Sequence, residues 1–225
     1  MAEVHGIAEE WARVKGTVAG LWPLFLGLFA GGFALAMAIF GFLAAGLALF
    51  TVAFAATGLA LIRGMRRIAS FFIGARGEER VSRILSELPP GYHVFNDFVA
   101  KGRHIDHVVV GPAGVYAVET KCWRGEVTVE DGHILFNGSL PSRAPLAQAL
   151  NEAEWVRAAL AGAGWKGRVT PVLVFASNSF RSHIAEVGGA VVMNASEIGR
   201  SFASGRATIA PDELERLVSI MENGL

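Results

Sequence analysis

Several features that often reveal a protein's function are scarce in this sequence. Cysteine occurs once, at Cys122, which excludes an intramolecular disulfide and is compatible with a reducing cytoplasm. Neither charge sign prevails, and residues 71–225 hold 15 Lys or Arg against 17 Asp or Glu, a formal charge of −2. Bulk charge therefore gives no support for nucleic-acid binding. No Walker loop, Rossmann glycine pattern, nucleophile elbow or Cys/His zinc spacing is present in the sequence.

Charge is absent altogether from one long stretch. From Gly16 to Ile62, a run of 47 residues, there is no Asp, Glu, Lys, Arg or His. A spanning helix needs about 20 apolar residues, so the run predicts two transmembrane helices, about 17–38 and 42–62, with a turn near Gly41. A buried hairpin in a soluble bundle would need polar outer faces, and none is visible. We therefore interpret residues 1–70 as a membrane anchor.

The flanks of this run indicate its orientation. Arg13 and Lys15 precede it, and Arg63, Arg66 and Arg67 follow it. Positive residues at both ends favour a cytoplasmic position for both, which a two-pass protein with both termini in the cytoplasm satisfies. Before the run, apolar residues at helical spacing are compatible with a short interfacial helix or with an ordinary capping helix. They are Val4, Ile7, Trp11 and Val14.

The remaining residues, 71–225, alternate between helical and strand patterns. Helices are expected over 75–88, from Pro145 to about Leu160, and from Pro211 onward. Strands are expected over 92–100, 105–110, 115–121, 168–177 and 190–195, with a hairpin turn at Asp131-Gly132. This order predicts an α/β domain with a mixed central sheet and flanking helices.

Three charged residues interrupt two of the apolar strands. Glu119 and Lys121 share one face of their strand, and Asp106 stands at the same end of the preceding strand. If the turn at 111–114 makes these strands antiparallel neighbours, the three side chains meet. Two carboxylates and a lysine suit Mg²⁺ and a phosphate substrate. On spacing alone, a salt bridge at a sheet edge is an equally good explanation.

The first helix of this part supplies another carboxylate. Glu78 lies three and seven residues before Val81 and Leu85, on the apolar stripe, and is therefore aimed at the sheet. Glu79 instead pairs with Arg83 on the surface. A third inward carboxylate favours a metal site over three unrelated burials.

Over about residues 74–160, motif residues follow one another in a recognisable order. They are Gly77, Glu78, Val81 and Leu85, then Asn96-Asp97, then Ile105 to Gly111 with Pro112, Gly114 and Val115, then Glu119, Lys121 and Gly125, and finally Pro145, Gln148 and Ala149. This order resembles the nuclease-related domain family (NERD), which is itself similar to the PD-(D/E)xK nucleases.

The resemblance implies a restriction-endonuclease-like fold and a set of roles. Asp106 and Glu119 would hold Mg²⁺ or Mn²⁺, Lys121 would be the catalytic lysine, and Glu78 would complete the site. Gln148 would bind substrate or support the site, with a solvated helix residue as the alternative. The expected function is a membrane-anchored, metal-dependent nuclease on the cytoplasmic side, acting on DNA, with RNA as the second candidate. The alternative is an inactive nuclease-like domain that binds nucleic acid or a partner protein.

Overall fold

The chain forms two compact units. The computed structural model describes residues 1–6 and 10–223, apart from the side chains of residues 10–17, 19–21 and 65–71. One unit, here called the helical unit, comprises Trp11–Ile73, and the other, the α/β unit, comprises Met1–Glu10 and Gly74–Leu225. The N-terminal residues thus group with the α/β unit, whereas the sequence analysis placed all of residues 1–70 in the anchor.

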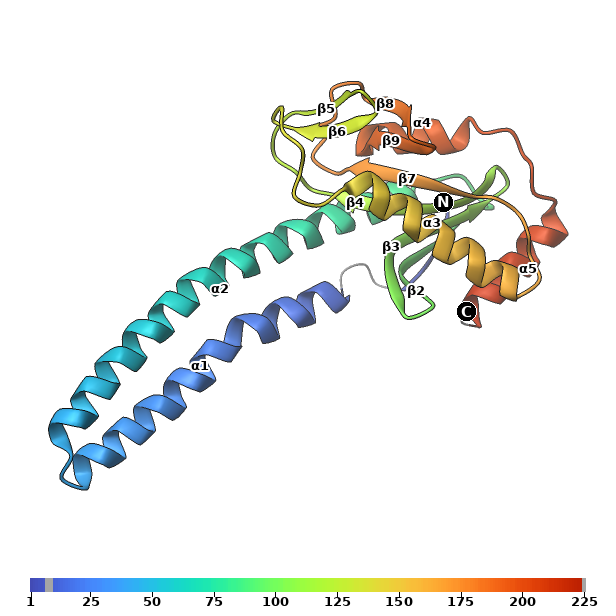
Figure 1. The fold of residues 1–225 in the computed structure, drawn as a ribbon. Helices are drawn as coiled ribbons and strands as arrows, with labels where there is room; N and C mark the ends of the chain where they lie inside the picture. Colours follow the sequence, from blue (N-terminus) through green and yellow to red (C-terminus); the bar gives the residue numbers. More distant parts are fainter. Residues whose placement is uncertain (7–9, 224–225) are drawn as a thin grey trace. The chain divides into compact units, whose positions relative to one another are not determined.

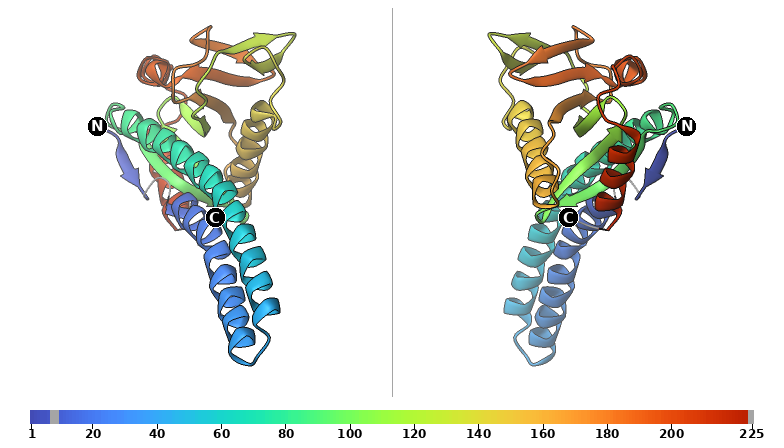
Figure 2. Two further views of the ribbon diagram at one scale, coloured as in Figure 1. Left: turned by 90° about the vertical axis from the view of Figure 1, so that its left-hand side faces the viewer. Right: turned by 90° about the vertical axis from the view of Figure 1, so that its right-hand side faces the viewer.

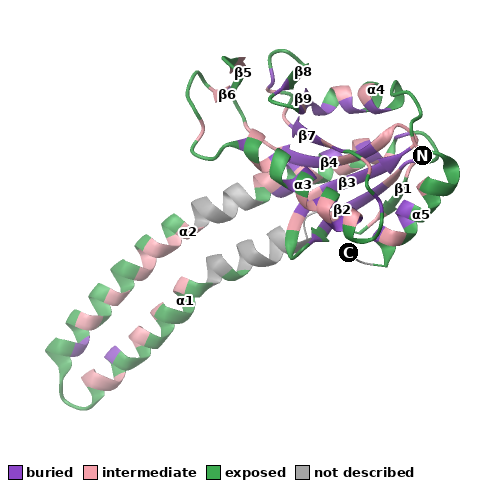
Figure 3. Ribbon diagram, turned by 45° about the vertical axis from the view of Figure 1, so that its right-hand side comes forward, coloured by how far each residue is buried: buried purple, intermediate pink, exposed green. Residues whose placement is uncertain are grey.

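The helical unit is an antiparallel hairpin of two long helices. Helix α1 spans Glu10–Ile39, α2 spans Leu43–Ser86, and Gly41 in the connection has a φ of +89° (Figure 1). The predicted turn at Gly41 is therefore confirmed. The stretches Trp22–Ile39 and Leu43–Gly64 are long and apolar enough to cross a membrane. In Figure 3 the described residues near the connecting turn are mostly exposed, as expected of surfaces that face lipid.

Small residues let the two helices approach closely. A Cβ built on Gly46 would lie 2.8 Å from the carbonyl oxygen of Ala34, and one on Gly27 would lie 2.6 Å from Thr57 Oγ1. Close packing through small residues is how helices associate where no water drives their burial. Figure 2 shows the two helices side by side in both views.

The helix expected over residues 75–88 is the last part of α2. It continues from the second apolar stretch without a break, since no proline interrupts residues 43–86. Pro89 and Pro90 end it, as predicted.

The α/β unit is built on a seven-stranded mixed sheet with strand order β1-β2-β3-β4-β7-β9-β8. The strands are β1 (Glu3–His5), β2 (His93–Ala100), β3 (Arg103–Gly111), β4 (Gly114–Lys121), β7 (Val169–Phe175), β8 (Ile184–Val187) and β9 (Ala190–Asn194). The pairs β2–β3, β3–β4 and β8–β9 are antiparallel, whereas β1–β2, β4–β7 and β7–β9 are parallel. The predicted mixed sheet is confirmed.

A separate two-stranded hairpin consists of β5 (Val127–Glu130) and β6 (His133–Phe136). Asp131 and Gly132, in its turn, both have positive φ, of 49° and 76°. This conformation is the one that an Asp-Gly sequence favours in two-residue turns.

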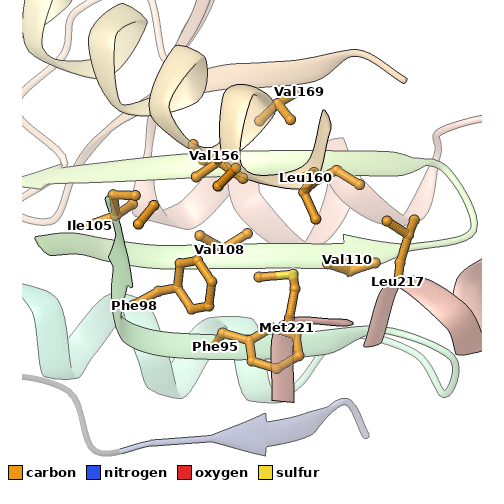
Figure 4. Close-up of a cluster of buried hydrophobic side chains, with 14 of the residues drawn as sticks. Phe95, Phe98, Ile105, Val108, Val110, Val156, Leu160, Val169, Leu217 and Met221 are labelled. Carbon is orange, nitrogen blue, oxygen red and sulfur yellow. The ribbon is translucent and has the colours of Figure 1, made fainter. Parts of the chain in front are cut away.

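Helices cover both faces of the large sheet. Helices α3 (Pro145–Gly162) and α5 (Pro211–Glu222) pack on one face, where Val156, Leu160 and Met221 meet Val108 and Val110 (Figure 4). The end of α2 and the short α4 (Ile198–Ala203), which follows a 3₁₀ turn at Ala195–Glu197, pack on the other face. Because side chains alternate along a strand, Val108 and Val110 of β3 face α3, whereas Val109 between them faces the end of α2.

Two strands were not expected. Strand β8 is short and largely exposed, so it carries no apolar pattern. Strand β1 has only three residues, and its Val4 was assigned to the expected interfacial helix. That assignment is wrong for Val4, whereas Ile7 and the side chains of Trp11 and Val14 lie outside the described residues.

Candidate active site

The ends of β3 and β4 bring the predicted charged residues together. The two strands pair antiparallel, and the last regular pair is His107 opposite Val118. Asp106 and Glu119 are the next residues of the two strands beyond this pair, so they lie side by side. The regular pairing stops there. The backbone N–H of Thr120 instead donates to Asp106 Oδ2 at 2.8 Å. Asp106 is thereby fixed at the strand end, on the face that α3 covers.

Helix α3, which covers this face of the sheet, contributes two further side chains to the cluster. Lys121 Nζ donates hydrogen bonds to Glu119 Oε1 and, at 3.1 Å, to Gln148 Oε1. Gln148 Nε2 in turn donates to Glu152 Oε1 at 2.9 Å, one helical turn along. The chain of contacts therefore runs from β4 through Lys121 and Gln148 to a glutamate that the sequence analysis did not name. We call Asp106, Glu119, Lys121, Gln148 and Glu152 the acidic cluster.

Burial makes the ionised forms of the carboxyl groups in this cluster unfavourable. Glu119 and Glu152 are each only 2% exposed. One oxygen of each, Oε2, is buried and accepts no hydrogen bond from the described residues. Buried ionised oxygens without a donor are unfavourable, and they are the kind of ligand that a hard cation seeks.

The protonation of the two glutamates reflects this cost. Burial raises the pKa of Glu119 to about 8, against the opposing charge of Lys121, and the nearby Glu152 raises it further. Burial, followed by the charge of Asp106, raises the pKa of Glu152 to about 7.

Asp106 and Lys121 respond to the same surroundings. Burial and then the charge of Glu119 raise the pKa of Asp106 well above its usual value. Burial alone would lower the pKa of Lys121, but Glu119, Asp106 and Glu152 outweigh it and raise that pKa. The lysine therefore stays charged beside carboxyl groups that share protons.

The donor set fits a divalent cation. Three carboxylates and one lysine carry a net charge of −2 when all are ionised, and carboxylate oxygens suit Mg²⁺ or Mn²⁺. Among the described residues, three potential ligand atoms lie within 4.8 Å of one another on β1 and β2, and these atoms do not belong to the acidic cluster. Ion binding at the acidic cluster therefore calls for a closer approach of its carboxylates.

Glu78 is positioned by a different element. It is half-buried on α2, beside Gly77, where a Cβ would lie 2.7 Å from Cys122 Cβ. This turn of α2 thus packs next to the residue that follows Lys121, whereas the hydrogen bonds of the acidic cluster link β3, β4 and α3. The role of Glu78 in the site stays a prediction.

Glu152 could have been found by the argument that was applied to Glu78. It lies three residues after Ala149 and four before Val156, both of them on the apolar stripe of α3. A carboxylate in such a stripe points at the sheet.

The histidines that flank Asp106 lie outside the acidic cluster. His107 is fully buried on the α2 face, and its Nδ1 is 2.7 Å from Asn96 Oδ1. Burial lowers the pKa of His107 to about 3, so its ring is neutral. His104 Nδ1 lies 2.9 Å from Asp97 Oδ1.

The α/β unit thus carries a buried cluster of carboxyl groups and a lysine at the end of two antiparallel strands. Residues 73–176 match the model of the nuclease-related domain, NERD, so this part of the chain is similar to that family. The matched range contains Glu78 and every residue of the acidic cluster. Neither curated proteins nor solved structures give a significant match to the chain.

Proposed function

We propose that this protein is a membrane-anchored nuclease that hydrolyses phosphodiester bonds in DNA with the help of Mg²⁺ or Mn²⁺. RNA is the second candidate substrate. The observation that carries the proposal is the acidic cluster, in which buried carboxyl groups surround a lysine inside a nuclease-related domain. A structural salt bridge would need one carboxylate, whereas this lysine has three around it.

Each member of the acidic cluster has a distinct role in this proposal. Asp106, Glu119 and Glu152 would hold the cation, with Glu78 as a predicted further ligand. The bound ion would polarise a phosphoryl oxygen and lower the pKa of a bound water. Lys121, held in the charged form by its neighbours, donates its N–H groups to the developing negative charge of the phosphate.

Gln148 acts as a positioning residue. Its Oε1 accepts from Lys121 and its Nε2 donates to Glu152, so the amide holds the lysine and the glutamate in one orientation. A side chain that joins a donor to a metal ligand restricts both, which is the arrangement that efficient catalysis requires.

The apolar hairpin would hold this domain at the membrane. Support comes from the two long apolar helices and from the exposed rings of Phe29, Phe40 and Phe54. The basic residues that flank the run favour a cytoplasmic position for both termini. A reporter fused after Leu225 should therefore be active inside the cell, and activity outside the cell would contradict this topology.

Cleavage assays on the full chain in detergent micelles test the nuclease activity. Labelled single- and double-stranded DNA and RNA are incubated with Mg²⁺, Mn²⁺ or a chelator. We expect metal-dependent cleavage of DNA that Asp106→Asn abolishes, because this variant keeps an acceptor for the Thr120 N–H but loses the charge. Glu130→Gln, at an exposed position on β5, is the matched control and should cleave like the wild type.

Equal background cleavage by the wild type and Asp106→Asn would refute the proposal. Binding of nucleic acid by the wild type without cleavage under any metal would instead support the alternative, a binding domain. Since residues 71–225 have a formal charge of −2, that binding should be weak and strongly weakened by salt.

A further inference from the structure

A second group of metal-ligating side chains lies at the β1 edge of the sheet, away from the central strand β4. Strand β1 pairs parallel with β2, with Glu3 opposite His93 and His5 opposite Phe95. Partners in a ladder share a face, and so do residues two apart, so Glu3, His5 and His93 project from the same face. Each offers one ligand atom, and these three atoms all lie within 4.8 Å of one another.

The two imidazoles are held in place by ring stacking, but each has a buried nitrogen without a hydrogen-bond partner among the described residues. The ring of His5 stacks on Phe95 at a centroid distance of 4.5 Å and on His93 at 5.9 Å. Among the described residues, His5 Nε2 and His93 Nδ1 are buried and form no hydrogen bond. Buried polar nitrogens without partners are unusual and call for an explanation such as a bound ion.

The spacing of one pair of these atoms matches that of two ligands on a metal ion. His93 Nδ1 lies 3.4 Å from Glu3 Oε2, too far for a strong hydrogen bond. Two ligands that are each about 2.0 Å from a tetrahedral ion lie about 3.3 Å apart. On the other side of His5, Nδ1 lies 3.4 Å from Glu222 Oε1 at the end of α5. A carboxylate on one ring nitrogen leaves the other, Nε2, as the ligand, as in many zinc sites.

From this geometry we propose that Glu3, His5 and His93 bind Zn²⁺, with Glu222 orienting His5. Two imidazoles and one carboxylate are ligands that Zn²⁺ prefers, and they distinguish this zinc site from the acidic cluster, whose oxygen donors suit Mg²⁺. The ligands come from β1 and β2, whereas the acidic cluster is built on β3, β4 and α3. Neither site shares a residue with the other.

The zinc site would fasten the N-terminal strand to the sheet. Strand β1 has three residues and is held beside β2 by a short ladder, and its neighbour Ala2 donates to the carbonyl of Ser86 at 3.1 Å. An ion that joins Glu3 and His5 to His93 crosslinks two segments that are almost 90 residues apart in the sequence. Such a ligand stabilises the folded form by an amount that grows with the logarithm of its concentration relative to its dissociation constant.

Zinc binding can be measured on the full chain in micelles after chelator treatment and dialysis. The Glu119→Gln background removes a carboxylate of the acidic cluster, so that binding there does not interfere. We expect one equivalent of Zn²⁺ by competition with a chromophoric chelator, and affinity at least about tenfold lower in His93→Ala. His133→Ala, which alters an exposed histidine on β6, is the control and should bind like its parent.

A second variant, Glu3→Gln, distinguishes loss of the zinc site from a folding defect. The Glu3 side chain is 73% exposed and glutamine has nearly the same size, so this substitution should leave the fold intact. It should also weaken Zn²⁺ binding, and Zn²⁺ should raise the thermal midpoint of the parent more than that of either variant. Co²⁺ should give the visible absorption of a tetrahedral complex in the parent only. Zinc affinity that is unchanged in both His93→Ala and Glu3→Gln would overturn the proposal.

The two proposals fail separately. Asp106→Asn is expected to abolish DNA cleavage and to leave Zn²⁺ affinity unchanged. His93→Ala is expected to lose Zn²⁺ and to retain metal-dependent cleavage with Mg²⁺. A single variant that removed both properties in a folded protein would contradict the assignment of two independent sites.

Discussion

Raising the pH in the absence of divalent cations should destabilise the α/β unit, because the acidic cluster holds protons that the unfolded chain releases. The pKa of Glu119 is about 8 and that of Glu152 about 7 in the folded protein, against an ordinary 4.5. Between about pH 5 and pH 7, the folded state is therefore the more protonated one on these two residues. Unfolding releases protons, so the free energy of unfolding falls as the pH rises through these folded-state pKa values.

The size of this effect follows from proton linkage. One proton that is bound only in the folded state changes the free energy of unfolding by about 1.4 kcal/mol per pH unit. A single glutamate would thus lower the free energy of unfolding by about 3 kcal/mol between about pH 5 and pH 7. This is a large share of the roughly 5–15 kcal/mol of unfolding free energy that is typical of domains. Asp106, whose pKa is also raised by burial, acts in the same direction.

Urea denaturation of the full chain in micelles, followed by tryptophan fluorescence, measures this dependence. Trp165 reports on the α/β unit, since it is 8% exposed in the core that α3 and α5 cover. In a chelating buffer, we expect the stability to fall from about pH 5 to pH 7 and to be restored by Mg²⁺, which binds the ionised carboxylates. Glu119→Gln, which cannot titrate, should show a shallower slope than the control Glu130→Gln. Stability that rises over this range, or an equal slope in the two variants, would refute the reasoning.

Further predictions concern single contacts. Gln148→Leu removes the 3.1 Å hydrogen bond to Lys121, so kcat should fall about tenfold with KM nearly unchanged, and Gln148→Glu should not restore it because it adds a fourth carboxylate. Gly46→Leu places a side chain against the Ala34 carbonyl, so it should force α1 and α2 apart and lower the yield of crosslinks between cysteines introduced on the two helices. Gly58, at which a Cβ meets nothing within 4 Å, is the control position for this substitution. Leu85→Ala, in the core between α2 and the sheet, should cost about 2–5 kcal/mol of stability, whereas the half-exposed Leu150→Ala should cost much less.

Much of the candidate site could be predicted because its residues lie close together in the sequence. Asp106, Glu119 and Lys121 belong to strands joined by a tight turn, so alternation along each strand and the antiparallel pairing fix their meeting. Glu152 comes from a helix that begins 24 residues after Lys121, and nothing local specifies how that helix lies across the sheet. Its inward orientation could be read from the helical period, but its contact with Gln148 and the lysine depends on tertiary packing.

The edges of the fold were harder to predict, because they too depend on contacts between residues that are distant in the sequence. Strand β1 is only three residues long and has no pattern of its own, and its partner β2 begins at His93. The long helix α2 joins two stretches that the sequence analysis treated separately, because the change from apolar to amphipathic composition resembles a boundary. Local periodicity identifies the type of an element, whereas long-range pairing decides where it starts and what it contacts.

The most direct test of the central claim is the rate of DNA cleavage by Lys121→Met compared with Lys166→Met under saturating Mg²⁺ or Mn²⁺. Lys121 lies within the acidic cluster and Lys166 is exposed, so the two variants remove the same charge from different surroundings. The account predicts that cleavage is lost in Lys121→Met, retained in Lys166→Met and abolished in both by a chelator. Equal cleavage by the two variants, or cleavage that persists in the chelator, would contradict it.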